Sequence, residues 1–177
     1  MTHKAIAARQ HTFTATDKLF LDANIWLSLY WPGDTQHFWT RIYSKVFQRI
    51  LDAKSQIYID VLLLSEFMNA YARQHWRLAE SRPSFKQFRK SAAFEPIAKR
   101  TADAIQEIMG YCTPVESNFT TLEIDNLLTD YVSGDYDFND QVITHLCKTN
   151  DLTLVTNDSD FKTDEIPILT ANYSLLR

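Results

Sequence analysis

The sequence predicts an α/β domain of three layers, in which helices cover both faces of a mainly parallel sheet of four to five strands. Two observations predict this class. Short runs of β-branched and aliphatic residues alternate with longer segments of helical periodicity. The chain has 177 residues, of which 45% are hydrophobic, enough to bury the core of one such domain. We therefore expect a single domain over residues 1–177.

The first half of the chain begins this alternation. Strands are expected over residues 18–22 and 56–60, and helices over 23–30, 38–53 and 62–78. The strand segments are short runs of β-branched, aliphatic and aromatic residues. The helix over 38–53 is amphipathic, because Phe38, Ile42 and Val46 recur on one face. Pro32-Gly33 should stop the helix before it.

The second half continues the alternation. Helices are expected over 96–109, 120–131 and 138–149, strands over 111–115 and 152–156, and a short edge strand over 166–169. Pro96 fits a first helical turn, and Gly110 and Gly134 are expected to end helices. Pro167 favours an edge position for the last strand. Residues 77–96 are polar and basic, and we expect a basic helical insertion there.

The composition disfavours several classes of protein. The longest aliphatic run is Val61–Leu64, and no segment resembles a membrane span or a secretory leader. Cys112 and Cys147 each lie in apolar sequence, which disfavours a disulfide or a zinc site. The five histidines have no ligand spacing. We expect a cytoplasmic protein without membrane contact.

Charge is distributed unevenly along the chain. The net charge is −4, which argues weakly against a nucleic-acid partner. However, residues 73–100 carry about +6 and residues 116–165 carry about −10. The sequence therefore combines a basic segment with an acidic one.

Four acids are expected to meet at one edge of the sheet. Asp22 closes the first strand, and Asp158 follows the strand at 152–156. Glu66 comes one turn into the helix after the second strand, and Asp140 lies in the first turn of the last helix. Because ligands of open α/β sheets bind beyond the carboxyl ends of the strands, all four acids can reach one site.

Such a group of carboxylates needs compensation for its charge. Ionised acids repel each other unless protons, basic side chains or metal ions compensate, and few Lys or Arg lie near these four in the sequence. Oxygen ligands favour hard cations, so the expected cofactor is Mg²⁺ or Mn²⁺. The chemistry implied is phosphodiester hydrolysis by metal-activated water.

Four segments of the chain resemble the PIN-domain nucleases, a family that includes VapC-like toxin ribonucleases. They lie at 20–26 (FLDANIW), 64–67 (LSEF), 139–144 (NDQVIT) and 154–161 (LVTNDSDF). The last segment is the most specific and the second the least, and the resemblance spans roughly residues 18 to 170. It implies a PIN-like fold and a Mg²⁺- or Mn²⁺-dependent endoribonuclease that cleaves RNA.

The resemblance also assigns roles by position. The metal-binding catalytic acids would be Asp22, Glu66, Asp140 and Asp158, with Asp160 as a further metal ligand. Asp137 would be an auxiliary ligand or a group that supports the ligands, and Asn24 would contact the cluster. Thr156 would orient a carboxylate or a water molecule through its hydroxyl. The residues expected to contact RNA are Arg73, Arg77, Arg82, Lys86, Arg89 and Lys90. A basic stretch of this kind is equally typical of a solvated helix face.

Each acid also has a structural interpretation. Asp22 alone would more often cap the following helix, and only its place among the other acids reverses this. Asp137 fits a helix cap better than a site role. Turn formation suits both Asp158 and Asp160; we prefer metal binding for Asp158, and either role fits Asp160. Glu66 is hardest to explain structurally, because an acid on the sheet-facing side of a helix is costly without a partner.

Two functions compete at this point. The leading hypothesis is a metal-dependent endoribonuclease, with an RNA substrate and, for the toxin of a toxin–antitoxin pair, an antitoxin partner and a homodimer. The alternative is a PIN-like scaffold that binds RNA or protein with little or no catalysis, but four mutually repelling carboxylates argue against it. A phosphatase with an aspartyl nucleophile is disfavoured, because Asp22-Ala23-Asn24 replaces the Asp-x-Asp that it needs. The chain is longer than the compact toxins of this family, which weakens the toxin assignment.

Overall fold

Six parallel strands form one sheet in the computed structural model, which describes residues 5–30, 38–79, 83–134, 137–161 and 165–177. The strand order is β1-β6-β5-β2-β3-β4, and every neighbouring pair is parallel. The strands are β1 (Ile6–Ala7), β2 (Lys18–Leu21), β3 (Gln56–Ile59), β4 (Cys112–Pro114), β5 (Thr153–Val155) and β6 (Ile168–Thr170). The predicted parallel α/β class is confirmed, with six strands instead of four to five.

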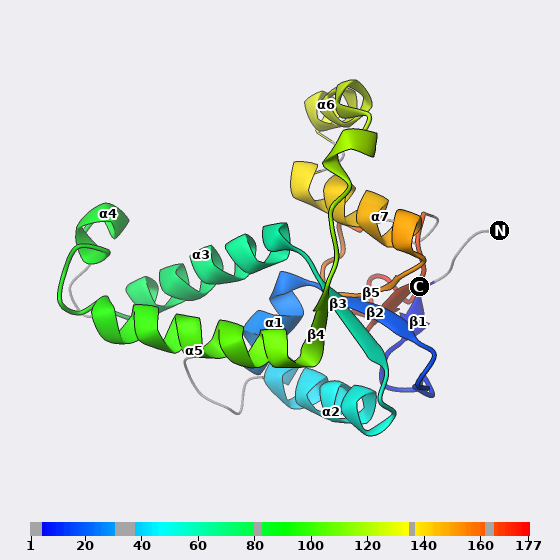
Figure 1. The fold of residues 1–177 in the computed structure, drawn as a ribbon, viewed down its shortest axis with the longest axis horizontal. Helices are drawn as coiled ribbons and strands as arrows, with labels where there is room; N and C mark the ends of the chain where they lie inside the picture. The colour runs from blue at the N-terminus through cyan, green and yellow to red at the C-terminus, as the bar shows by residue number, and fades with distance from the viewer. Residues whose placement is uncertain (1–4, 31–37, 80–82, 135–136, 162–164) are drawn as a thin grey trace.

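Helices cover both faces of this sheet. They are α1 (Ala23–Leu29), α2 (Phe38–Asp52), α3 (Val61–Leu78), α4 (Phe85–Phe88), α5 (Glu95–Tyr111), α6 (Ile124–Ser133) and α7 (Phe138–Asn150), with a 3₁₀ turn at Phe119–Thr121. The strands run between α1 and α2 on one side and α7 on the other (Figure 1). The central strands are apolar and fully buried at Phe20 and Leu154. None of the helices in the described ranges is long and apolar enough to cross a bilayer.

Two of the helices form an arm that extends from the sheet. α3 and α5 pack side by side, and α4 lies at the far end of the pair (Figure 1). Buried apolar residues hold them together, among them Tyr71 of α3 and Ala104 of α5. Near the tip, the indole of Trp76 donates to the carbonyl oxygen of Pro83 at 2.8 Å. Within residues 77–96, the described residues comprise the end of α3, the four-residue α4 and the start of α5, while 80–82 lie outside the described residues. A basic helical insertion here stays a prediction.

Four details of the elements differ from the sequence predictions. β1 was not predicted, because two residues are too short to show periodicity. Since β1 pairs with β6, the strand that contains Leu169 lies inside the sheet and not at its edge. Gly110 does not end α5, which runs on to Tyr111; Gly134 does end α6, with a left-handed φ of 79°. α6 begins at Ile124, because Thr121 belongs to the preceding 3₁₀ turn.

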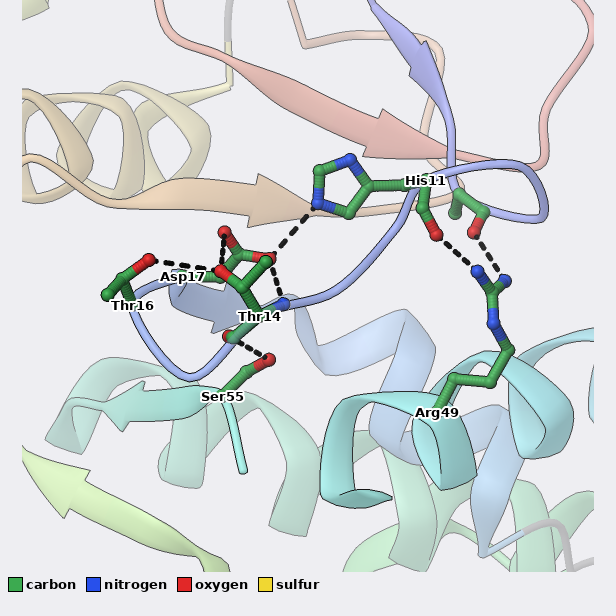
Figure 2. A network of polar contacts seen from close by, with 7 residues as sticks. His11, Thr14, Thr16, Asp17, Arg49 and Ser55 are labelled. Carbon is green, nitrogen blue, oxygen red and sulfur yellow. Dashed lines mark hydrogen bonds and ion pairs between the residues drawn. The ribbon is translucent and has the colours of Figure 1, made fainter. Parts of the chain in front are cut away.

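A polar network fixes the segment between β1 and β2 (Figure 2). Asp17 accepts hydrogen bonds from the backbone N–H of Thr14 at 3.0 Å and contacts Nε2 of His11 at 3.1 Å. From α2, the Arg49 guanidinium donates to the carbonyl oxygens of Arg9 and His11. These hydrogen bonds attach the segment that connects β1 to β2 to helix α2.

Candidate functional site

Asp22 follows β2 directly and lies at the carboxyl end of the central strands. Its backbone N–H donates to the carbonyl oxygen of Val155 at 3.0 Å, which continues the β2–β5 pairing by one residue. The residue is only 5% exposed. Its side chain makes no capping hydrogen bond to α1, although the residue occupies the N-cap position. The carboxylate is therefore held by side-chain groups around it, one of which comes from α1 itself.

Those groups are Thr156 and Asn24. Thr156 Oγ1 donates to Asp22 Oδ2 at 2.7 Å, and Asn24 Nδ2 donates to the same oxygen. Thr156 Oγ1 also accepts from Asn24 Nδ2 at 3.1 Å and from the backbone N–H of Asp158 at 3.0 Å. One fully buried hydroxyl thus links the ends of β2 and β5 and the start of α1.

Glu66 and Asp140 approach from two helices whose starts are capped by other acids. Asp60 caps α3 by accepting from the backbone N–H of Leu63 at 2.9 Å, which places half-buried Glu66 one turn further on. Asp137 caps α7 by accepting from the backbone N–H of Asn139 at 2.8 Å. In the structure Asp137 is exposed and acts as a cap, and half-buried Asp140 lies in the first turn of α7.

Burial and mutual repulsion raise the pKa of three of these acids. Burial is the main cause of the rise in the pKa of Asp22 to about 6, and hydrogen bonds from Thr156 oppose it. Burial, followed by repulsion from Asp22, raises the pKa of Glu66 and that of Asp140 to about 7 each. Asp158 contributes to all three shifts. Asp22, Glu66, Asp140 and Asp158 therefore interact electrostatically, and we call them the acid cluster.

Asp160 lies at the rim of the acid cluster. The backbone N–H of Asp160 donates to Asp158 Oδ1 at 3.0 Å, and Asp160 is exposed to solvent. Together with Asp140 and Asp130 of α6, it lines a hollow of about 150 Å³ between α6, α7 and the segment after β5. The turn geometry at Asp158 and the exposure of Asp160 are both compatible with contact to a ligand from solvent.

The donor chemistry of the acid cluster fits a hard divalent cation. It offers carboxylate oxygens only, and a cation would relieve the repulsion that raises the pKa values of Glu66 and Asp140. Within the described ranges, however, no three Asp, Glu, His or Cys side chains are arranged so that they could hold a metal ion. The acids gather at one edge of the sheet without forming a closed ligand set.

The sequence analysis missed the buried acid Asp60 and the contact between Tyr43 and Asn157 at this site. Asp60 is buried, and its Oδ2 has no hydrogen-bond partner among the described residues. It follows β3 as Asp22 follows β2, so the same rule would have found it. The Tyr43 hydroxyl donates to Asn157 Oδ1 at 3.0 Å and accepts from the backbone N–H of Ala171 at 3.1 Å. No local pattern in the sequence indicates that contact.

The basic residues predicted to contact RNA lie along the arm. Those described are all exposed: Arg73 and Arg77 on α3, Lys86 on α4, and Arg89 and Lys90 just after it. We call these five residues the basic arm; Arg82 lies outside the described residues. Arg73 comes two turns after Glu66 on α3, about 10 Å further along the helix axis. The groups that most perturb the pKa of Glu66, after burial, are all acids, so the arm is a separate region.

The fold and the site together define a class: a parallel α/β protein with carboxylates gathered beyond the carboxyl ends of its strands. The family model of the PIN domain matches residues 19–164. The chain belongs to the PIN-domain family, and PIN domains are generally nucleases.

Two solved structures are similar to this chain, and the first of them agrees on the fold. The crystal structure of VapBC2 from Rickettsia felis bound to a DNA fragment from their promoter is similar with a TM-score of 0.54 and 14% identity, over 86% of this chain and 98% of that chain. PAE2754 from Pyrobaculum aerophilum has a TM-score of 0.47 and 19% identity, over 87% of this chain and 90% of that chain. A search of curated proteins found no match.

Proposed function

We propose that this protein is a Mg²⁺- or Mn²⁺-dependent endoribonuclease that hydrolyses RNA phosphodiester bonds. The observation that carries the proposal is the burial of Asp22 at the end of two central strands, where Thr156 and Asn24 fix its carboxylate. Glu66 and Asp140 face the same charge from two helices. Carboxylates that lie this close repel one another, which costs free energy. Such a group is expected where a bound cation compensates the charge. Membership of the PIN-domain family supports a nuclease.

The proposed roles follow from how each side chain is held. Asp22, Glu66, Asp140 and Asp158 are the metal ligands, and Asp160 is a further ligand from the rim. When bound, the cation lowers the pKa of a water molecule and compensates the charge of the phosphate. Thr156 and Asn24 hold the Asp22 carboxylate in one orientation. The role of Asp137 is to cap α7, which carries Asp140.

Two further parts of the proposal concern partners. The basic arm binds the phosphates of the RNA on either side of the cleaved bond, and residues 77–96 are the insertion that supplies most of it. The fold of VapBC2, a toxin–antitoxin complex by its name, supports an antitoxin as the regulating partner. A homodimer and a cytoplasmic location complete this proposal.

The decisive experiment is RNA cleavage by wild type and by Asp22→Asn, with and without Mn²⁺. We expect cleavage by wild type only with the metal, and a loss of roughly a hundredfold or more in Asp22→Asn. Asp52→Asn is the matched control, because Asp52 is exposed on α2 and its carboxylate accepts a hydrogen bond from Gln48 of the same helix. Equal cleavage by wild type and Asp22→Asn would mean that a contaminating nuclease is responsible and that the proposal is wrong.

A further inference from the structure

A cavity of about 190 Å³ lies beside the acid cluster, between α1, α2, α3 and the segment after β5. Two of its lining residues belong to the network around Asp22. Asn24 donates to the Asp22 carboxylate, and its own Oδ1 accepts from the backbone N–H of Asn157 at 3.2 Å. The cavity and the acid cluster therefore share a wall.

The described residues that line this cavity carry no charge. They comprise three amide side chains, two aromatic residues, a serine and a leucine. A phosphate group would call for cationic partners and a cation for anionic ones, and the described lining offers neither. Amide side chains recognise the donor and acceptor edges of nucleobases, and aromatic side chains stack on their faces. The lining suits a flat, neutral group with hydrogen-bonding edges.

One wall residue has an unsatisfied hydrogen-bonding group. Gln74 lies two turns after Glu66 on α3, and its Oε1 is shielded from water without a partner among the described residues. A buried acceptor in this state costs stability unless a ligand supplies a donor. The amino and imino groups of a nucleobase are such donors.

The opposite wall is rigid before any ligand binds. The Tyr43 hydroxyl bonds to Asn157 Oδ1 and to the backbone N–H of Ala171, so neither Tyr43 nor Asn157 is free to rotate. The bond from Tyr43 orients the Asn157 amide, whose NH₂ group is the donor that it can offer to a ligand. Trp39 is half-buried and packs beside Tyr43 with ring centroids 6.3 Å apart. Trp39 provides the aromatic surface for stacking.

We propose that this cavity binds one unstacked nucleobase of the RNA, directly beside the phosphate that the acid cluster addresses. The inference rests on the proposed nuclease function and adds a source of sequence preference to it. Trp39 stacks on the base, while Gln74 and Asn157 contact its edge. A single-stranded RNA segment fits this role, because a base inside a duplex cannot enter a pocket without unpairing.

The test measures binding without cleavage. Tryptophan fluorescence of the wild-type protein is titrated in EDTA with each of the four homotrinucleotides and with an abasic ribose-phosphate trimer. We expect quenching by at least one base-containing trimer and none by the abasic trimer. Gln74→Leu should weaken that binding roughly tenfold, because it removes the hydrogen bonds and keeps the volume. Trp39→Phe should remove most of the quenching.

Gln106→Leu is the matched control, since Gln106 is exposed on α5. Melting curves of all variants verify that they are folded. Equal binding of abasic and base-containing trimers overturns the inference, and so does unchanged binding in Gln74→Leu. Absence of fluorescence quenching by every trimer also overturns it, and is the result expected if a partner's peptide fills the cavity. Metal-dependent cleavage without base-dependent binding overturns the inference alone. Base-dependent binding without any cleavage overturns the nuclease and leaves the base pocket standing.

Discussion

The acid cluster and the basic arm hold their charges in opposite ways. In the acid cluster, Asp22 is buried and hydrogen-bonded by Thr156 and Asn24, and burial and repulsion raise the pKa values of Asp22, Glu66 and Asp140. In the basic arm, the cations are exposed and spaced along a helix pair. Arg73, although exposed, also contacts a neighbouring side chain, because its guanidinium lies over the Phe85 ring at 4.7 Å from the centroid.

This difference indicates how each region responds to substitution. A buried carboxylate costs free energy that the fold must recover elsewhere, so changes in the acid cluster should affect activity and stability in opposite directions. An exposed cation costs little and contributes little to stability. Changes in the basic arm should therefore act on RNA affinity alone.

The largest effect is expected from Glu66→Gln. Cleavage should fall by roughly a hundredfold or more, because a metal ligand is lost. The melting temperature of the metal-free protein should rise at pH 8, because a half-buried charge that raises the pKa of Asp140 is removed. Cleavage assays and thermal melts check the two parts. Glu116→Gln, at an exposed position, should change neither the cleavage rate nor the melting temperature. A lower melting temperature for Glu66→Gln would contradict the proposal that the Glu66 charge destabilises the metal-free protein.

A smaller effect should follow from Thr156→Val. The change removes the hydroxyl that donates to Asp22 and accepts from the backbone N–H of Asp158. We expect a loss of about 10- to 100-fold in metal affinity or cleavage, measured by calorimetric metal titration. Thr156→Ser keeps the hydroxyl and should retain most of the activity. If Val and Ser behaved alike, the hydroxyl would have no orienting role.

The acid cluster also predicts a pH dependence of stability. The pKa values of Glu66 and Asp140 rise from ordinary values near 4 to about 7 on folding, so the folded protein binds more protons than the unfolded chain between these limits. Stability of the metal-free protein should therefore fall as pH rises from about 4 to 7. Differential scanning calorimetry should give a melting temperature several degrees lower at pH 8 than at pH 5.5. Mn²⁺ should raise it more at pH 8; equal shifts at both pH values would contradict metal binding by these acids.

The basic arm should give the smallest effect. The double change Arg77→Gln and Lys90→Gln should weaken RNA binding severalfold at low salt and reduce the salt slope by about 1.4, if each cation neutralises one phosphate of a single strand. Fluorescence anisotropy over a range of salt concentrations measures both quantities. Lys18→Gln, with Lys54→Gln, is the control pair, because both residues are exposed and lie outside the arm. Equal losses in the two pairs would show that only net charge matters.

The sequence predicted the alternating elements well, because strand and helix periods differ over segments longer than a few residues. It failed at β1, where two residues carry no period, and consequently at the position of β6. Gly110 lies within α5 and does not end it, whereas Gly134 ends α6 because its backbone is left-handed.

The placement of the acids was predictable from strand and helix ends, because parallel strands bring their carboxyl ends to one edge. The contacts that hold them were not. Thr156 and Asp22 are separated by 134 residues, and the contact between Tyr43 and Asn157 joins α2 to the segment after β5. Such pairs depend on how the layers pack and leave no spacing in the chain.

The outer strands of the sheet have a consequence for how copies of this protein can associate. β1 has two residues, and β4 has three, of which Pro114 cannot donate a backbone hydrogen bond. Short strands and proline are the features that keep a sheet edge from pairing with another chain. Self-association through strand addition is therefore disfavoured at both described ends of the sheet. Deleting residues 5–8 would remove β1 and expose the backbone of β6, whose three residues are now all buried. The unpaired edge of β6 could then pair with a strand of another chain.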